Sequence, residues 1–119
     1  YDAYEKQDYQ TALDLWLPLA KASQNGEVYQ ISWVQYDLGM LFYEGEIVQR
    51  DYEKAANMFK KSAEQGFVDS QFALGILYIN GEGVMKSYKK AADWINKANE
   101  NGHERAEEVW NKYELWNYE

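Results

Sequence analysis

Cysteine is absent from the 119 residues of this chain, and proline occurs only once. Without cysteine the chain can form no disulfide and offers no thiolate ligand for a metal. No apolar stretch approaches the 18 or so residues that a membrane-spanning helix needs, so the sequence predicts no membrane insertion. No run of Lys or Arg exceeds a pair, and the net charge is −8, which argues against nucleic acid as a partner.

Apolar and aromatic residues are abundant: 46% of the chain is hydrophobic and 17% is aromatic. This is enough to fill the core of one domain over residues 1–119. The acidic balance favours a basic protein partner through electrostatic steering. The chain begins at Tyr1 rather than Met, so we expect an upstream segment that was removed, and the compartment stays open between bacterial periplasm or cell envelope and cytoplasm.

An internal repeat with a period of 36 residues organises the sequence. Shifting the chain by one period aligns many identical residues without a gap between Val34 and Ala106. The identities in the first copy are Gln35, Leu38, Gly39, Leu41, Gly45, Glu46, Val48, Tyr52, Lys54, Ala55, Ala56, Lys61, Glu64 and Gly66. Such a period predicts a stack of similar supersecondary units.

Each period is predicted to contain two helices. The first covers about residues 34–44 and again 70–80, where apolar residues follow helical spacing. The second begins after an N-cap, Asp51 or Ser87, and ends at Gly66 or Gly102. A glycine inside a helix costs roughly 1 kcal/mol relative to alanine. The recurrence of Gly39 as Gly75 therefore predicts that a neighbouring helix leaves no room for a Cβ atom.

The two ends of the chain complete the expected architecture. Residues 1–33 are predicted to form a divergent first copy, with Asp8 as a cap, a kink at Pro18, and an insertion over residues 21–33. That insertion is predicted to be either a hydrophobic binding loop or a lid over the first helix pair. The repeats then cover about 1–33, 34–69 and 70–105, and a helix over 104–117 caps the stack. The fold class is all-α, a right-handed solenoid of antiparallel helix pairs (an α/α superhelix).

The repeated motif resembles the Sel-one-like repeat, a relative of the tetratricopeptide repeat. The best match is Ser70 to Tyr78 with the turn Gly81-Glu82-Gly83-Val84, followed by Lys90-Ala91-Ala92 and Gly102. Ile47 departs from the pattern, because it stands where a second turn glycine is expected. The resemblance covers nearly the whole chain. It implies a protein–protein interaction scaffold or adaptor, and alternatively a small acidic inhibitor or immunity protein that blocks a toxin or secreted effector.

The candidate binding site is the concave face, which the first helix of each pair is expected to line. Aromatic and aliphatic side chains there would anchor a protein or peptide partner, although they could instead pack between repeats. We expect Met40, Tyr43, Ile76 and Ile79 to favour exposure. The full candidate set is Trp33, Tyr36, Met40, Tyr43, Glu44, Phe72, Ile76, Ile79 and Asn80.

Signals of catalysis are weak. Ser87-Tyr88-Lys89-Lys90 contains the Ser-x-x-Lys pattern of penicillin-binding enzymes, but its companion motifs are missing, so Ser87 is interpreted as a helix cap. His103 is the single histidine and has no companions at ligand spacing, so we interpret it as a solvated residue at a helix start. The sequence predicts no catalytic residue, no metal site and no cofactor, and we expect a protein that is not an enzyme.

Overall fold

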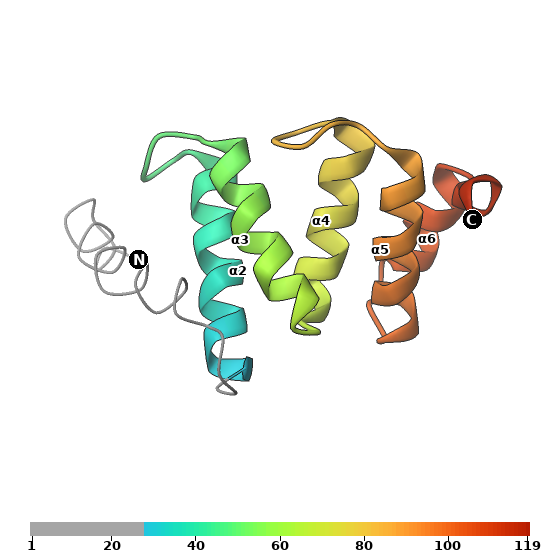
Figure 1. Ribbon diagram of the computed structural model, residues 1–119, viewed down its shortest axis with the longest axis horizontal. Helices are drawn as coiled ribbons and strands as arrows, with labels where there is room; N and C mark the ends of the chain where they lie inside the picture. The colour runs from blue at the N-terminus through green and yellow to red at the C-terminus, as the bar shows by residue number, and fades with distance from the viewer. Residues whose placement is uncertain (1–27) are drawn as a thin grey trace.

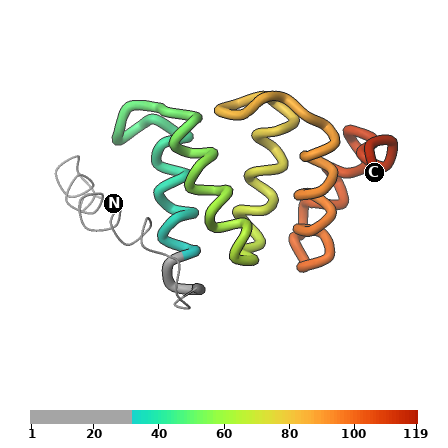
Figure 2. The backbone as a smooth tube through the Cα atoms, in the orientation of Figure 1, coloured from blue at the N-terminus to red at the C-terminus, as the bar shows by residue number. Residues whose placement is uncertain are grey.

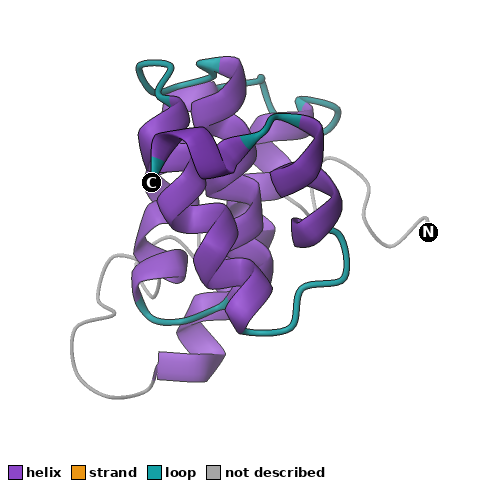
Figure 3. Cartoon of the chain, turned by 90° about the vertical axis from the view of Figure 1, so that its right-hand side faces the viewer, coloured by secondary structure: helices purple, strands orange, loops and turns teal. Residues whose placement is uncertain are grey.

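The described part of the chain is helical throughout. The computed structural model describes the backbone of residues 28–119 and the side chains from Ser32 onward, and this part contains helices and loops without a strand (Figure 3). Most of the predicted first copy, including Asp8 and Pro18, lies outside the described residues. Within them, the expectation of an all-α fold is confirmed.

The helices follow one another as antiparallel pairs (Figure 1). The first pair is α2 (Val28–Glu44) with α3 (Tyr52–Glu64), and the second is α4 (Val68–Asn80) with α5 (Tyr88–Glu100). Helix α6 (Ala106–Lys112) and the 3-10 helix η2 (Leu115–Tyr118) follow at the C-terminal end. The backbone reverses at each connection and advances in one direction from pair to pair, which is the arrangement of a helical solenoid (Figure 2).

The predicted helix caps are present at both second helices. The Asp51 carboxylate accepts a hydrogen bond from the Lys54 backbone N–H at 3.0 Å, and the Ser87 hydroxyl oxygen accepts one from Lys90 at 3.1 Å. Each bond satisfies a backbone donor that the first turn of a helix leaves without an intrahelical partner. The same helices end before Gly66 and Gly102, whose φ angles of 95° and 91° suit glycine.

The recurring glycines mark the closest approaches between paired helices. A Cβ atom on Gly39 would lie 2.7 Å from Phe59 Cε1, and one on Gly75 would lie 2.5 Å from Ile95 Cδ1. Both distances are far below van der Waals contact. The prediction that Gly39 and Gly75 allow tight packing is therefore confirmed, and the contacts join α2 to α3 and α4 to α5.

A pair of amide hydrogen bonds also repeats along the solenoid. Gln65 Nε2 donates to Gln35 Oε1 at 3.2 Å, and Asn101 Nδ2 donates to Gln71 Oε1 at 3.0 Å. Both acceptor residues are buried, so losing the bond would leave a polar group unsatisfied. This explains why glutamine recurs at positions 35 and 71: each ties the first helix of a pair to the end of the second.

Helix boundaries differ from the prediction at the start of α2 and α4. Helix α2 begins at Val28, so residues 28–33 of the predicted insertion are helical and neither a loop nor a lid. Residues 21–27 of that insertion lie outside the described residues. Helix α4 begins at Val68, two residues before the expected start at position 70. The repeated motif on which the prediction rests begins inside each helix, so it does not mark the first residues of the helix.

The C-terminal helix also differs from the continuous one expected over 104–117. Helix α6 ends at Lys112, and Glu114 takes a φ of 52°. The chain then turns into η2, which places Leu115 in the core with no exposed surface. A positive φ is uncommon and strained for a residue other than glycine. The burial of Leu115 offsets this strain at Glu114.

Candidate functional site

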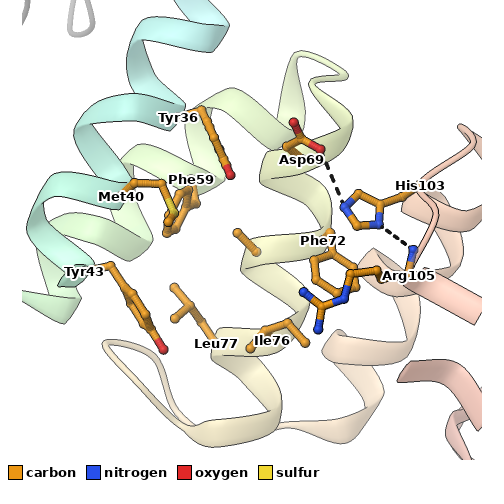
Figure 4. A pocket seen from close by; sticks show the side chains of 11 residues that line it. Tyr36, Met40, Tyr43, Phe59, Asp69, Phe72, Ile76, Leu77, His103 and Arg105 are labelled. Atoms are coloured by element: carbon orange, nitrogen blue, oxygen red, sulfur yellow. Dashed lines mark hydrogen bonds and ion pairs between the residues drawn. The ribbon is translucent and has the colours of Figure 1, made fainter. Parts of the chain in front are cut away.

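A pocket of about 390 Å³ lies between α2, α4 and the turn that precedes α6. We call it the α2–α4 groove. Figure 4 shows side chains from these three segments surrounding a common space. Its lining is mainly aromatic and aliphatic, and consists of Tyr36, Met40, Tyr43, Phe59, Asp69, Phe72, Ala73, Ile76, Leu77, His103 and Arg105.

The α2 side of the groove follows from helical spacing. Tyr36, Met40 and Tyr43 stand at i, i+4 and i+7, which places them along one side of the helix. Tyr36 is held by two tilted aromatic contacts, with ring centroids 5.8 Å from Phe59 and 5.5 Å from Phe67. Aromatic pairs favour such tilted geometries. The Tyr36 ring is therefore a fixed part of the wall.

The α4 side is built around Phe72. The His103 imidazole stacks on the Phe72 ring with centroids 4.1 Å apart and planes only 7° from parallel. The Arg105 guanidinium also approaches this ring, with Cζ 5.6 Å from its centroid. Ile76 stands one turn further along α4 and extends the apolar surface. This wall therefore combines the apolar surface of Phe72 and Ile76 with the polar groups of His103 and Arg105.

His103 is fixed by contacts on both ring nitrogens. Nδ1 accepts a hydrogen bond from the Arg105 backbone N–H at 3.1 Å, so the neutral ring carries its proton on Nε2. Nε2 lies 3.5 Å from Asp69 Oδ1. The side chain is only 15% exposed. The interpretation of His103 as a solvated residue is wrong, because the fold brings Phe72 and Asp69 against it.

A hydrogen-bonded cluster closes the opposite end of the groove. The Tyr43 hydroxyl donates to Glu82 Oε1 at 3.0 Å, and Asn80 Nδ2 donates to the same oxygen at 3.2 Å. Burial, and then the hydrogen bond to Glu82, raise the pKa of Tyr43 to about 12. Tyr43 is therefore neutral at any physiological pH. The cluster links the C-terminal end of α2 to the loop after α4.

The Asp69 carboxylate lies at the Tyr36 end of the groove. Burial raises the pKa of the Tyr36 phenol above its ordinary value, and the charges of Asp69, Asp37 and Glu44 add to this effect. Figure 4 places Tyr36 and Asp69 at one end of the groove and Tyr43 at the other. Arg105 is the only Lys or Arg among the described lining residues. The groove thus has an acidic end and a separate cationic edge.

Some of the predicted site residues line the groove, some are exposed outside it, and one is buried in the core. Tyr36, Met40, Tyr43, Phe72 and Ile76 line the groove together. Trp33, Glu44 and Asn80 are exposed outside its lining.

Ile79 is the exception to the expected exposure, because it is buried in the core and only 3% exposed. It occupies the position equivalent to Tyr43 in the next repeat. Tyr43 places its hydroxyl at the rim, whereas isoleucine has no polar atom to place there and packs inward.

Sequence reasoning missed the lining residues that come from outside the two predicted stripes. These are Phe59, Asp69, Ala73, Leu77, His103 and Arg105. The repeat register contains a signal for His103, because one period earlier Phe67 contacts Tyr36, and Tyr36 is equivalent to Phe72. No comparable pattern identifies Asp69 or Arg105, whose positions depend on the turn geometry.

A metal-binding cluster and a membrane-spanning helix were looked for among the described residues. Among residues 28–119, no three or more His, Asp or Glu side chains gather in a way that could hold a metal ion. In the same range, no helix has the length and apolar character needed to cross a membrane.

Comparison with known proteins gives one family and several solved structures. The model of the Sel1 repeat matches residues 34–67 and again 68–103. A Sel1 repeat protein from Oxalobacter formigenes is similar at 36% identity and a TM-score of 0.67 over 69% of this chain. Helicobacter pylori cysteine-rich protein B is similar at 21% identity and a TM-score of 0.63, over 87% of this chain and 96% of that one.

A third similar structure is a protective antigen of uropathogenic Escherichia coli strains that displays an SLR fold. It is 24% identical, with a TM-score of 0.62 over 85% of this chain. The chain spans about a quarter of the length of this antigen and of the Oxalobacter protein, 26% and 24% respectively. A comparison with curated proteins found no match. The predicted resemblance to the repeat family is therefore confirmed by two independent kinds of comparison.

Proposed function

As the chain belongs to the Sel1 repeat family, whose members generally mediate protein–protein interactions, we propose that it binds a segment of a partner protein in the α2–α4 groove. The family is typically a non-enzymatic scaffold, and the same role is proposed for this chain. The comparisons give no support to the alternative of an inhibitor or immunity protein.

The observation that supports this site is the groove's apolar lining. Met40, Phe72 and Ile76 come from two different helices and face one pocket. Each is only partly buried by the chain itself, so a bound side chain would remove further apolar surface from water. At about 25 cal/mol per Å², such burial is the usual source of binding energy for an anchoring side chain.

The rigidity of the walls supports the same role. Tyr36 is packed between two rings, Phe72 is stacked on His103, and Tyr43 is hydrogen bonded to Glu82. Side chains that are already ordered lose little conformational entropy when a partner binds. The groove is therefore suited to holding a partner segment without rearrangement.

The test is a pull-down that compares the wild-type chain with a Met40→Glu, Ile76→Glu variant. Both substitutions place a carboxylate in the apolar lining, so we expect the groove-dependent partner to be lost. The matched control is Asn57→Glu, Asn99→Glu, which adds the same charge at exposed positions of α3 and α5 outside the groove. The control is expected to retain the partner.

Circular dichroism must first establish that both variants remain folded. If the groove variant unfolds, Ile76→Ser replaces it, because a serine is smaller and uncharged. A partner that binds the groove variant as well as the wild type would contradict the proposal and move the site elsewhere on the chain. If the control variant also loses the partner, the added negative charge is the cause of the loss, and the change in the groove is not.

A further inference from the structure

The charges around the α2–α4 groove are arranged asymmetrically. Asp69 lines the groove beside the Tyr36 ring, and 56% of its side chain is exposed. Arg105 lines the other edge, over Phe72. A partner segment lying in the groove would therefore meet a carboxylate and an aromatic ring at the Tyr36 end, and a guanidinium along the α4 side, over Phe72.

The Asp69 carboxylate is held in place without a Lys or Arg partner. Its Oδ1 faces His103 Nε2 at 3.5 Å, and this is the only ion-pair contact within the described part of the chain. His103 Nδ1 accepts a hydrogen bond from a backbone N–H, which leaves Nε2 to face the Asp69 carboxylate. The carboxylate thus lies beside an imidazole nitrogen, and no Lys or Arg forms an ion pair with it within residues 28–119.

Tyr36 adds a second feature that suits a cation. The ring is fixed against Phe59 and Phe67, and its pKa is raised by burial and then by Asp69, Asp37 and Glu44. An aromatic ring beside a carboxylate attracts a Lys or Arg side chain both through the ring quadrupole and through charge. The apolar part of the groove lies directly beside it.

We propose that the groove selects a peptide segment in which a Lys or Arg lies close to a bulky apolar side chain. The apolar side chain occupies the space between Met40, Phe72 and Ile76, and the cation lies between the Asp69 carboxylate and the Tyr36 ring. This inference rests on the proposed function and specifies the chemistry of the partner.

Arg105 fixes the orientation of the bound segment. A cation placed near the Phe72 edge would meet a like charge, which disfavours binding in that orientation. A neutral or acidic residue is accepted there. The order along the bound segment therefore runs from the cation at the Tyr36 end to a neutral or acidic residue at the Arg105 edge.

The experiment is a selection from a random peptide library displayed on phage, with the folded wild-type chain as bait. Binders are counted only when the Met40→Glu, Ile76→Glu variant fails to retain them. We expect these groove-dependent peptides to be enriched in Lys or Arg near a large apolar residue. An enriched peptide is then synthesised in two forms, as selected and with its cation replaced by Gln.

Three variants separate the parts of the inference. Asp69→Asn is expected to weaken the cationic peptide about three- to tenfold and to leave the Gln peptide unchanged. Arg105→Gln is expected to strengthen the cationic peptide by about twofold. Glu53→Gln is the matched control, since Glu53 and Asp69 both lie in the first turn of a helix, and it should change neither affinity. The effect of Asp69 should also shrink in high salt.

The outcomes distinguish the two proposals. Groove-dependent peptides without an excess of cations would overturn this inference and leave the proposed function standing. The same holds if Asp69→Asn weakens both synthetic peptides equally. A library that yields no groove-dependent binder would overturn the proposed function and this inference with it.

Discussion

The two repeats over residues 34–67 and 68–103 share a framework and differ at the groove. Tyr36 packs on Phe67 in the first repeat, and the equivalent pair in the second is Phe72 with His103. The replacement of phenylalanine by histidine adds a ring nitrogen that lies 3.5 Å from Asp69 Oδ1. The comparison indicates that positions facing the groove can vary while the helices that present them stay in place.

The framework itself is nearly identical in the two repeats. The Asp51 backbone N–H donates to Phe42 O at 2.9 Å, and Ser87 makes the equivalent bond to Tyr78 O at 3.0 Å. The loops that these bonds close differ inside, because the first contains Ile47 where the second contains Gly83. Only the glycine has a positive φ, of 74°. The same loop span is therefore reached by two local backbone paths.

The largest expected effect comes from substituting alanine at these two equivalent loop positions. A Cβ atom on Gly83 would press into the backbone carbonyl of Tyr52, and φ at Gly83 is positive. Gly83→Ala should lower the free energy of unfolding by about 3 kcal/mol. Ile47→Ala removes only part of a half-buried side chain and should cost about 1 kcal/mol. Chemical denaturation measures both, and equal losses would contradict the two-path interpretation.

A smaller difference is expected between the two packing glycines. An alanine at position 39 would meet the Phe59 ring, which is rigid and almost fully buried. At position 75 it would meet Cδ1 and Cγ1 of Ile95, which is just as buried but has a flexible side chain in place of a rigid ring. After the gain of about 1 kcal/mol in helix propensity, Gly39→Ala should cost about 2 kcal/mol and Gly75→Ala about 1 kcal/mol. Thermal unfolding ranks them, and the reverse order would contradict this account.

The features shared by both repeats are the ones that the sequence could predict. The period, the caps Asp51 and Ser87, and the packing role of Gly39 and Gly75 all depend on local chemistry that occurs twice. Helix starts were harder, because α2 and α4 begin earlier than the repeated motif, at Val28 and Val68. Repetition thus identifies the scaffold more reliably than its boundaries.

The groove was predictable only where it follows one helix. Met40 and Ile76 were found from spacing, because side chains one turn apart share a side of the helix. His103 was missed because its contacts with Phe72 and Asp69 join residues some thirty positions apart. The exposure predicted for Ile79 is wrong, although Ile79 occupies the same repeat position as Tyr43. Isoleucine lacks the hydroxyl that keeps Tyr43 at the rim of the groove, so it packs inward. Contacts between residues far apart in the sequence depend on tertiary packing, which the apolar spacing along a single helix does not describe.

The smallest expected effect tests Asp37, whose equivalent in the second repeat is Ala73. Burial raises the pKa of the Asp37 carboxyl above its usual 3.8. A carboxyl whose pKa is higher in the folded state contributes stability at pH values below its pKa in the unfolded state. That contribution is lost as the pH rises through its pKa in the folded state. Asp37→Asn should therefore increase the free energy of unfolding at neutral pH, by roughly a few tenths of a kcal/mol after solvent screening.

The pH dependence decides whether burial of the charge is the cause. The advantage of Asp37→Asn over the wild type should shrink as the pH falls towards and below 3.8, where the wild-type carboxyl becomes neutral as well. Asp93→Asn is the control, because Asp93 is exposed on α5 and its substitution should change stability little at any pH. The account would be wrong if Asp37→Asn did not raise the free energy of unfolding at neutral pH, or raised it as much in acid. The apolar Ala73 of the second repeat would then confer no electrostatic advantage over Asp37.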